Sequence, residues 1–457
     1  MSASWSTSLL TDMYELTMVE AALKHGTAER RSVFELFGRR LPTTRRFGVV
    51  AGTSRILEAL ERFVFSKEDI DYLHQQKIVN DDTLDFLKDF HFQGNIWGYQ
   101  EGECYFAGSP LLTVEGTFAE ACLLETVLLS ILNHDCAVAS AASRMTIAAH
   151  GRPCLDMGAR RTHERAAVSA ARASIIGGFK ASSDLEAGKR YGIGTLGTSA
   201  HSFTLLHETE EEAFRAQVAT LGPGTTLLVD TYDIPKGVET AVRVAREAGG
   251  ELGAVRIDSG DLVAQAFKVR GQLDELGAKT TKITVTSDLD EYAIAALGAA
   301  PVDAYGVGTK LVTGSGIPTA ALVYKLVERE GAEGFMEGVA KKSKSKSTVA
   351  GRKWAARAFD EDGYASEERL YVGSYEDFQK TLAAEEAEGT HLRPLQVKLV
   401  TDGNIDRTWY DESSLERAAN FHQEVRNQLP YSAWRLSAGE PAIETRVIPL
   451  ESASPLN

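Results

Sequence analysis

The spacing of hydrophobic and polar residues predicts a mixture of helices and strands in the first third of the chain. Residues 11–26 repeat apolar side chains at helical spacing. Residues 46–63 predict a short strand, a glycine turn and an amphipathic helix, and residues 95–116 contain short β-rich runs separated by Gly and Pro. A long helix is predicted over 120–150. Its buried stripe consists of Leu124, Val127, Leu128, Ile131 and Leu132.

From residue 151 onward, short apolar runs alternate with helical segments. This alternation predicts parallel βαβ units, and short strands followed by polar residues favour a closed or nearly closed β/α barrel over an open doubly wound sheet. The predicted strands are 153–157, 178–182, 195–199, 226–230, 254–258, 282–287 and 303–308. We therefore predict an α/β protein with a barrel at 151–324 and a discontinuous α/β outer domain at 1–150 and 325–457, which includes the long linking helix.

Composition and charge narrow the classes of function. The 457 residues are 43% hydrophobic and 25% charged, with a net charge of −15, which is typical of a globular enzyme and unfavourable for general binding of nucleic acid or anionic membranes. No spanning segment or signal peptide is evident, so we expect a cytoplasmic protein. The four cysteines have no metal-site spacing, so we expect buried free thiols and no protein-ligated transition metal.

Polar side chains follow most of the predicted barrel strands. In α/β barrels the C-terminal ends of the strands hold the site, so we expect these residues to meet at one mouth. They are Arg160, Arg161, Thr198, Ser199, His201, Asp230, Asp233, Asp258, Ser259, Ser287, Asp288 and the glycines of GVGTK.

Two of these motifs favour the binding of phosphate and ribose. Gly306, Gly308 and Thr309 lie in GVGT, where free backbone amides can surround a phosphate, although such a run also occurs in plain tight turns. In RIDSGDL, Arg256 can bind a carboxylate or phosphate with two donors, and Asp258 can accept from ribose hydroxyls or bind magnesium through water. Ser259 and Gly260 then begin a helix where a second anion could bind. A structural ion pair between Arg256 and Asp258 is the alternative.

Other strand-end residues leave more than one interpretation open. In an extended segment adjacent side chains alternate, so we expect Arg160 to face the mouth and Arg161 to lie at the rim or in an ion pair. His201 can be an acid, a base, a nucleophile or a structural residue. The run TLLVDTYD resembles the fingerprint of flavodoxin-like phosphoribosyltransferases, but their adjacent acidic pair and Thr-Gly-Gly loop are missing. Asp230 remains a candidate for a metal or ribose contact.

A basic run interleaved with Ser and Gly follows the predicted barrel. We interpret it as a solvated loop, with a loop that meets phosphates at the barrel mouth as the alternative. It comprises Lys341, Lys342, Lys344, Lys346, Arg352, Lys353 and Arg357. The tail from residue 423 carries β-like pieces, and we expect it to pack against the N-terminal region.

Seven short motifs occur in the order found in nicotinate phosphoribosyltransferases, and the chain resembles that family from about residue 9 to residue 326, more loosely beyond. The motifs are TDMYELTM, DMGARRTH, GGFKASSDLEAG, GTSAHSF, LLVDTYD, VRIDSGDL and YGVGT. The resemblance implies the type II phosphoribosyltransferase fold, an irregular β/α barrel with an α/β outer domain, in a homodimer with shared active sites. The implied reaction joins nicotinate to phosphoribosyl pyrophosphate, releases pyrophosphate and nicotinate mononucleotide for NAD biosynthesis, and is coupled to ATP hydrolysis, with Mg²⁺ on the pyrophosphate.

The same resemblance assigns roles to individual residues. Tyr14 would stack on the nicotinate ring from the neighbouring subunit, while Thr198 and Arg256 would hold the nicotinate. Thr309 would bind the sugar 5-phosphate in a turn shaped by Gly306 and Gly308. His201 would be phosphorylated transiently by ATP. The chemistry of the strand ends, rather than the resemblance, adds further residues to the expected substrate site: Arg160, Asp258, Ser259, Gly260 and Asp288, with Asp258 supporting the ribose and Asp230 as a candidate metal or ribose contact.

Three alternatives compete with this interpretation: a related enzyme for nicotinamide or quinolinate, a barrel oxidoreductase, and a pure binding module. A related enzyme could use nicotinamide instead of nicotinate. Enzymes that use nicotinamide carry an aspartate on the strand that corresponds to GGFKASSD. At that place this chain has Ser182 and Ser183, followed by Asp184. Quinolinate would need a second carboxylate clamp. A barrel oxidoreductase acting on phosphorylated substrates would need a reactive cysteine or a cofactor fingerprint at the mouth. A pure binding module would leave the charged strand ends unexplained.

Overall fold

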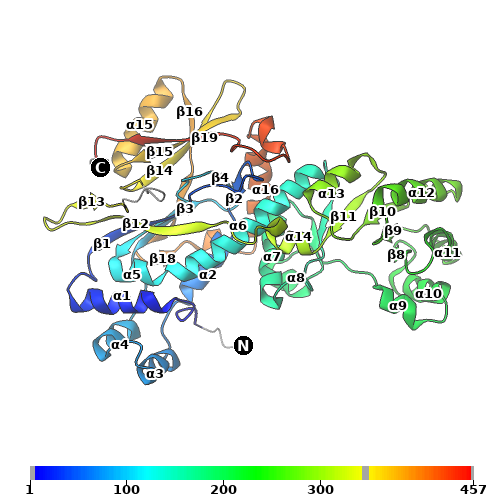
Figure 1. Cartoon of the computed structure of the whole chain (residues 1–457), viewed down its shortest axis with the longest axis horizontal. Coiled ribbons are helices and arrows are strands. Elements are labelled where there is room, and N and C mark those ends of the chain that lie inside the picture. Colours follow the sequence, from blue (N-terminus) through cyan, green and yellow to red (C-terminus); the bar gives the residue numbers. More distant parts are fainter. Residues whose placement is uncertain (1–5, 342–348, 454–457) are drawn as a thin grey trace. The chain divides into compact units, whose positions relative to one another are not determined.

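The computed structural model describes residues 6–341 and 349–453, which form two compact units (Figure 1). Unit 1 comprises residues up to Ala137 and from Thr319 onward, and unit 2 comprises Val138–Pro318. The first division lies inside helix α6 (Glu125–Ala148). The sequence pattern places the corresponding limits at 150 and 325.

Unit 1 is built on a seven-stranded antiparallel sheet. Its central strand β1 is buried along nearly its whole length, and Leu36 of β1 faces Leu112 of β5. A strand buried on both faces is mostly apolar, and the one buried charge within β1, Glu35, accepts hydrogen bonds from the backbone and side chain of Lys353. The strand order is β13 (Met336–Gly338), β12 (Leu322–Glu330), β1 (Arg31–Gly38), β5 (Leu112–Thr117), β3 (Asn95–Tyr99), β17 (Gln396–Thr401) and β18 (Asn404–Ile405).

The C-terminal tail returns to the N-terminal part of unit 1, as predicted. Strand β19 (Glu444–Pro449) pairs in parallel with β15 (Ala365–Val372), in a sheet that continues through β14 (Lys353–Phe359) to β16 (His391–Pro394). The backbone N–H of Ala442 donates to the carbonyl of Arg46 at 2.8 Å. A two-stranded sheet of β2 (Gly48–Val49) and β4 (Cys104–Tyr105) completes the strands of this unit.

Short helices cover the sheets of unit 1. The predicted first helix is α1, which begins after Asp12. The predicted long helix is interrupted at Leu124, so α5 and α6 replace it. The helices are α1 (Met13–Lys24), α2 (Thr53–Glu61), α3 (Lys67–Gln75), α4 (Asp81–Lys88), α5 (Phe118–Leu123), the first half of α6, α15 (Tyr375–Ala387) and α16 (Ser414–Asn427), with 3₁₀ turns at Arg407–Trp409 and Tyr431–Trp434.

The basic run after the barrel is only partly a loop. Lys342, Lys344 and Lys346 lie outside the described residues. Arg352 and the two basic residues of β14 were predicted to belong to a solvated or phosphate-binding loop, and that prediction is wrong. They are largely or fully buried in ion pairs, because carboxylates on strands around them compensate their charges. The pairs are Arg352 with Glu115, Lys353 with Glu35, and Arg357 with Glu368.

His422 on α16 is buried, and we expect it to make the stability of the protein sensitive to acid. Its Nδ1–H donates to the carbonyl of Gly102 at 2.8 Å, while burial, assisted by the charge of Arg426, lowers the pKa of His422 to about 3. Between that value and the ordinary pKa of 6.5, the unfolded chain binds a proton that the folded chain does not. Stability must therefore fall as the pH decreases through this window, by up to about 1.4 kcal/mol per pH unit.

The measurement is the melting temperature of wild type and of His422→Gln at about pH 5 and about pH 7.5. Glutamine keeps a hydrogen-bonding side chain but cannot be charged. The melting temperature of the variant should therefore fall less on acidification than that of wild type. An equal loss in both proteins would contradict the assignment.

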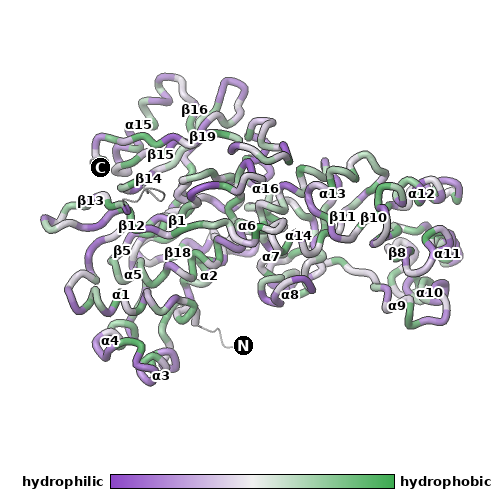
Figure 2. Tube along the Cα trace, viewed as in Figure 1, coloured by the Kyte–Doolittle hydropathy of each residue, from purple (hydrophilic) through white to green (hydrophobic). Residues whose placement is uncertain are grey.

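Unit 2 contains a six-stranded sheet in which all the strands are parallel. The order is β7 (Ala181–Ser182), β6 (Cys154–Asp156), β11 (Ala304–Val307), β10 (Lys282–Val285), β9 (Ala254–Ile257) and β8 (Thr226–Leu228). Within the described chain no strand ladder joins β7 to β8, so the irregular β/α barrel that we predicted is present in an open form. Figure 2 shows hydrophilic and hydrophobic residues alternating along α11.

The predicted strand at 195–199 is reduced to one bridge, between Thr195 and Ser182. The backbone N–H groups of Ser182 and Leu196 complete two hydrogen bonds there, after which the chain turns away. The residues that follow are Gly197, Thr198 and Ser199, which offer no apolar side chain for a sheet face.

Helices connect the strands of unit 2. Most of them begin directly after a polar residue whose side chain caps the first turn. Asp184, Asp233, Asp261 and Asp290 each accept a hydrogen bond from a backbone N–H of the first turn. The helices are α7 (Glu164–Ile176), α8 (Leu185–Tyr191), α9 (His201–Leu206), α10 (Glu210–Leu221), α11 (Ile234–Glu247), α12 (Leu262–Glu275), α13 (Glu291–Ala296) and α14 (Thr309–Val312), with 3₁₀ turns at Leu297–Ala299 and Gly314–Gly316.

Candidate active site

A cavity of about 510 Å³ lies in unit 2, at the C-terminal ends of its parallel strands. Every strand of a parallel sheet ends at the same edge, so residues far apart in the sequence meet there. The predicted site residues that line the cavity are Arg160, Thr198, Arg256, Asp258, Asp288, Gly306, Gly308 and Thr309. Met157, Ala159, Arg161, Ser183, Leu196, Gly197, Ser199, Ala200, Thr286 and Ser287 complete the lining.

Gly306 allows two strands to approach each other beneath the cavity. A Cβ atom at this position would lie 2.5 Å from Cγ2 of Thr286 and 2.6 Å from Sδ of Met157, closer than atoms can pack. At Gly308 the nearest atom to such a Cβ is the carbonyl oxygen of Met157, at 3.4 Å. Glycine is therefore required by packing at 306, while at 308 it leaves the backbone uncovered at the cavity wall.

Arg256 brings a poorly compensated positive charge into the cavity. Its Nη1–H donates to the carbonyl of Ser199 at 3.4 Å, and its buried Nε has no hydrogen-bond partner within the described residues. Burial lowers the pKa of Arg256, and the positive charge of Arg160 lowers it further. The carboxylates of Asp258 and Asp230 act in the opposite direction and raise that pKa. A buried guanidinium with unused donors is suited to a carboxylate or a phosphate.

Asp230 supports the strand end that carries Asp258. Its Oδ2 accepts hydrogen bonds from the backbone N–H of Asp258 at 2.8 Å and from Oγ of Ser259 at 2.7 Å. Oγ1 of Thr286 donates to Oδ1 of Asp258. Asp258 is thus held from two sides. Asp230, Ser259 and Gly260 lie outside the cavity lining, although all were predicted as site residues.

His201 begins α9, directly after Ala200 of the cavity lining. Its Nδ1 lies 3.0 Å from Oγ1 of Thr231, and its Nε2 lies 3.8 Å from Oδ1 of Asp230. The side chain is 40% exposed while that of Asp230 is fully buried. The imidazole is therefore accessible from solvent and close to the carboxylate that supports Asp258.

The segment after β7 presents hydroxyls to the cavity. Asp156 accepts a hydrogen bond from Oγ of Ser182 at 2.6 Å, and burial raises the pKa of this carboxyl. Ser183 lines the cavity. Asp184 accepts from the backbone N–H of Ala187 at 2.9 Å and so caps α8, and it is not among the lining residues.

Both arginines of DMGARRTH line the cavity, so the expected alternation, with Arg160 alone facing the mouth, is not found. Strand β6 ends at Asp156, and the backbone N–H of Arg161 donates to the carbonyl of Gly158 at 2.8 Å. The residues form a turn in which the alternation of an extended strand does not apply.

Thr286 and Ser183 line the cavity without having been predicted as site residues, whereas Ser287 was expected at the mouth. Thr286 lies near the end of a predicted strand and Ser183 directly follows one. Their position at the ends of apolar runs is the signal that could have found them.

Tyr14 lies in unit 1, on α1, with 42% of its surface exposed. Its hydroxyl donates to Glu125, and burial of the hydroxyl together with this carboxylate raises the pKa of Tyr14. The described residues contain no group of three or more His, Cys, Asp or Glu side chains arranged to hold a metal ion. No helix of the described chain is long and apolar enough to cross a membrane. All four cysteines are free and buried, as predicted.

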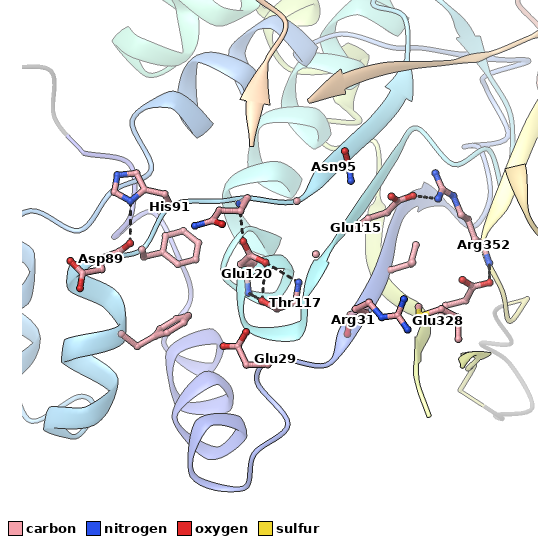
Figure 3. A pocket seen from close by; sticks show the side chains of 18 of the residues that line it. Glu29, Arg31, Asp89, His91, Asn95, Glu115, Thr117, Glu120, Glu328 and Arg352 are labelled. Carbon is pink, nitrogen blue, oxygen red and sulfur yellow. Dashed lines mark hydrogen bonds and ion pairs between the residues drawn. The ribbon is translucent and has the colours of Figure 1, made fainter. Parts of the chain in front are cut away.

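A cavity of about 770 Å³ in unit 1 contains none of the predicted site residues (Figure 3). Its charged side chains largely serve the fold. Glu120 forms a capping box with Thr117, Glu328 accepts from the backbone N–H of Arg352, and Arg31 pairs with Glu330. The strand-end cavity of unit 2 is therefore the candidate active site.

Comparison with known proteins agrees with the motifs. A family model described as the nicotinate phosphoribosyltransferase N-terminal domain matches residues 9–133. The chain is 51% identical over 449 residues to nicotinate phosphoribosyltransferase pncB1 of Mycobacterium tuberculosis (strain CDC 1551 / Oshkosh), covering 96% of this chain and 95% of that protein. It is 38% identical to nicotinate phosphoribosyltransferase of Bacillus subtilis, covering 81% of this chain and 77% of the relative.

Solved structures share the fold. Human nicotinic acid phosphoribosyltransferase matches with a TM-score of 0.78 at 24% identity, over 96% of this chain and 98% of its own. Nicotinate-nucleotide pyrophosphorylase from Pyrococcus furiosus matches with a TM-score of 0.71 at 22% identity, over 94% of this chain and 96% of its own. Together with the sequence relatives, these findings show that the chain belongs to the nicotinate phosphoribosyltransferase family.

Proposed function

We propose that this protein transfers the phosphoribosyl group of phosphoribosyl pyrophosphate to nicotinate, forming nicotinate mononucleotide and pyrophosphate for NAD biosynthesis. The observation that carries the proposal is the placement of Arg256, with an unused donor edge, in the same cavity as Asp258 and the Gly306–Thr309 turn. One cavity thus combines a site for a carboxylate, an acid for a ribose and a turn for a phosphate.

Arg256 and Thr198 would hold the nicotinate. The ring carboxylate of nicotinate can accept from the guanidinium, whereas an amide in its place would lack the charge. The segment after β7 favours the acid, because it offers Ser183 to the cavity while Asp184 is used as a helix cap. Quinolinate would need a second carboxylate clamp, which leaves nicotinate as the ligand that best fits these side chains.

The phosphoribosyl substrate would lie across the ends of β9, β10 and β11. Backbone amides of the Gly306–Thr309 turn and the side chain of Thr309 suit its 5-phosphate, with Arg160 as a second cationic contact. Asp258 and Asp288 suit the ribose hydroxyls. Ser259 and Gly260 would contribute to substrate binding through the loop that positions Asp258. The hydroxyl of Ser259 and the backbone N–H of Asp258 both donate to the carboxylate of Asp230.

The transfer step needs positioning and charge stabilisation. The pyridine nitrogen of nicotinate attacks the anomeric carbon of the ribose as the bond to pyrophosphate breaks, and the sugar passes through a cation-like state. The carboxylate of Asp258, held by Thr286 and by the loop on Asp230, stabilises that positive charge. Mg²⁺ bound to pyrophosphate would neutralise charge on the leaving group. The carboxylates of Asp258 and Asp288, which line the cavity, would offer the oxygen donors that this ion prefers. Asp230 would act indirectly, because it holds the loop of Asp258.

ATP hydrolysis would be coupled to this transfer through His201. If Nδ1–H donates to Thr231, the lone pair of Nε2 can attack the γ-phosphorus of ATP, forming phosphohistidine and ADP; water later releases inorganic phosphate. The added phosphoryl group would face the carboxylate of Asp230, 3.8 Å from Nε2 in the unmodified protein. Repulsion at that point would act on the loop of Asp258, because Asp230 holds it.

A homodimer with shared sites is the assembly that we propose. Tyr14 lies in a cluster of exposed apolar side chains on and before α1, an unusual surface for an isolated chain. The cluster consists of Leu9, Leu10, Met13, Tyr14 and Met18. In a dimer it would be covered by a second copy, with the ring of Tyr14 stacked on nicotinate in the partner's cavity. The expected cytoplasmic location, like the absence of nucleic-acid and membrane partners, stays a prediction.

An oxidoreductase that uses a reactive cysteine fits less well. Cys154 lies within β6, and burial raises the pKa of its thiol to about 12, so a thiolate is disfavoured at neutral pH. The cavity lining of unit 2 contains no cysteine.

Replacing His201 with asparagine tests the coupling to ATP. The protein is incubated with ATP labelled at the γ-phosphate, any acid-labile phosphate is mapped, and pyrophosphate release from nicotinate and phosphoribosyl pyrophosphate is measured with and without ATP. Wild type should be labelled at His201 and stimulated by ATP. His201→Asn should lose both properties, with KM for phosphoribosyl pyrophosphate raised by about 5- to 150-fold relative to the ATP-stimulated wild type.

The matched control is His207→Asn at the end of the same helix, where Nδ1–H donates to the carbonyl of Phe203. It should retain labelling and stimulation. A His201→Asn protein that is still stimulated by ATP would refute the coupling. A wild type that releases no pyrophosphate with nicotinate would refute the proposed function itself.

A further inference from the structure

Glu15 is a fully buried carboxylate of unit 1 that the proposed reaction does not use. It lies in the first turn of α1, directly after the exposed Tyr14. Burial raises the pKa of Glu15, while hydrogen bonds from Thr11 and Thr126 act in the opposite direction. A buried carboxylate weakens a fold unless donors surround it, so the donors around Glu15 show which segments it holds together.

The carboxylate of Glu15 connects the first turn of α1 to the start of α6. Its Oε1 accepts hydrogen bonds from the backbone N–H of Thr126, at 3.0 Å, and from the hydroxyl of the same residue. Its Oε2 accepts from the hydroxyl of Thr11. Thr126 is the second residue of α6, where backbone N–H groups have no partner within their own helix and where the helix dipole favours a negative charge.

The start of α1 depends on this connection. Asp12 precedes the helix, but within the described chain its side chain makes no capping hydrogen bond. Helix ends fray unless such contacts fix them. The hydrogen bonds of Glu15 therefore fix the turn that carries Tyr14.

Tyr14 and Glu15 contact consecutive residues of α6. The hydroxyl of Tyr14 donates to Glu125, and the carboxylate of Glu15 accepts from Thr126. The contact of Glu15 is buried, whereas 42% of the surface of Tyr14 is exposed. Because the two side chains leave the backbone at neighbouring positions, a displacement of Glu15 from α6 would also move the ring of Tyr14.

We propose that Glu15 is a positioning residue for nicotinate binding: by fixing the first turn of α1 on α6, it holds the ring of Tyr14 in the orientation that stacks on nicotinate in the partner's cavity. The proposal rests on the proposed function and on the shared sites of the proposed homodimer. A ring that is held in place before the ligand arrives loses little conformational freedom on binding, which favours affinity. An apolar side chain at position 15 could not accept the hydrogen bonds that fix the turn.

Two substitutions of Glu15 test its role as an acceptor. Glu15→Met keeps an unbranched side chain of similar size but removes the acceptor, and Glu15→Gln keeps an oxygen that can accept from Thr126. Glu15→Met should raise KM for nicotinate by about tenfold, as expected for a lost ring contact, and should change KM for phosphoribosyl pyrophosphate far less. Glu15→Gln should restore most of the loss. If Glu15→Met does not fold, Thr126→Val removes one donor and should raise KM for nicotinate by about threefold.

A double variant and a matched control separate positioning from stability. Because Glu15 acts through Tyr14, Tyr14→Ala and Tyr14→Ala/Glu15→Met should have the same KM for nicotinate. Glu20→Met is the matched control, because Glu20 lies on the same helix and accepts from the backbone N–H of Asn80 at 2.6 Å. It should leave both KM values unchanged.

Mixed dimers test whether Glu15 acts on the neighbouring subunit. Glu15→Met and Arg256→Gln chains are coexpressed with different affinity tags, and the dimers that carry both tags are purified. One of their two sites combines an intact α1 with an intact cavity, so it should have the wild-type KM for nicotinate, which neither parent homodimer has. Mixed dimers of Tyr14→Ala and Arg256→Gln should behave in the same way.

The outcomes distinguish the inference from its foundations. A folded Glu15→Met or Thr126→Val protein with the wild-type KM for nicotinate would overturn the inference alone. So would additive losses in the double variant, or mixed dimers that recover with Tyr14→Ala but not with Glu15→Met. Mixed dimers that recover with neither would overturn the shared sites together with the inference. A wild type that releases no pyrophosphate with nicotinate would overturn both together with the proposed function.

Discussion

Replacing Arg256 with glutamine is expected to lower kcat/KM for nicotinate by about 30- to 1,000-fold. The substitution removes the positive charge that would pair with the ring carboxylate in a partly buried site, where water compensates that charge less well. Burial already lowers the pKa of Arg256, which shows that its charge is poorly solvated before a ligand binds. Nicotinamide carries no charge to lose, so its turnover should fall much less, and preference for the acid should decrease.

Steady-state kinetics with both pyridines measure this effect. Arg256→Lys keeps the charge but not the planar fork, so it should give an intermediate loss. Arg243→Gln is the matched control, because Arg243 is an exposed helix residue paired with Glu211 and Glu247. It should leave both activities unchanged. An equal loss for nicotinate and nicotinamide in Arg256→Gln would contradict a contact between Arg256 and the carboxylate.

Replacing Arg357 with methionine is expected to lower the free energy of unfolding by about 3–5 kcal/mol. Its Nη2–H groups donate to Oε2 of Glu368 at 2.7 Å and to the carbonyl of Cys104 at 2.8 Å, and Nη1 lies 3.6 Å from Oε1 of Glu103. Burial acts to lower the pKa of Arg357, but Glu368 and Glu103 outweigh it and raise that pKa. Without the guanidinium, the carboxylate of Glu368 would be buried with only the hydroxyls of Tyr99 and Ser109 as donors.

Urea unfolding of wild type and variants measures this loss. Arg357→Met combined with Glu368→Gln should recover part of it, because the uncompensated charge is removed as well. Arg215→Met, which breaks exposed pairs with Glu211 and Glu247, should lower the free energy of unfolding far less. If Arg357→Met were no more destabilising than Arg215→Met, the buried cluster would contribute nothing measurable to the fold.

The sequence by itself determined the class of fold and the edge of the sheet where the candidate site lies. Apolar runs short enough for buried parallel strands, alternating with helical segments, require polar residues to collect where the strands end. Arg256, Asp258 and Thr309 could be named for that reason before any coordinates, and all three line one cavity. The chemistry of these residues indicated the kind of ligand group each could bind, and the motifs shared with the family indicated the substrates.

Only the tertiary structure decided how each strand-end residue is used. Asp233 and Asp258 both follow a strand, yet Asp233 caps α11 and Asp258 lines the cavity. Arg161 lines the cavity because its segment turns, and Arg357 is compensated by one carboxylate more than 250 positions away, that of Glu103, as well as by one close in sequence, that of Glu368. The spacing of apolar residues shows which face of a helix or strand is buried, because side chains on one face recur with the period of that element. The partner of a polar side chain depends on contacts between segments that are distant in the sequence. Such contacts produce no periodic pattern of residues from which they could be predicted.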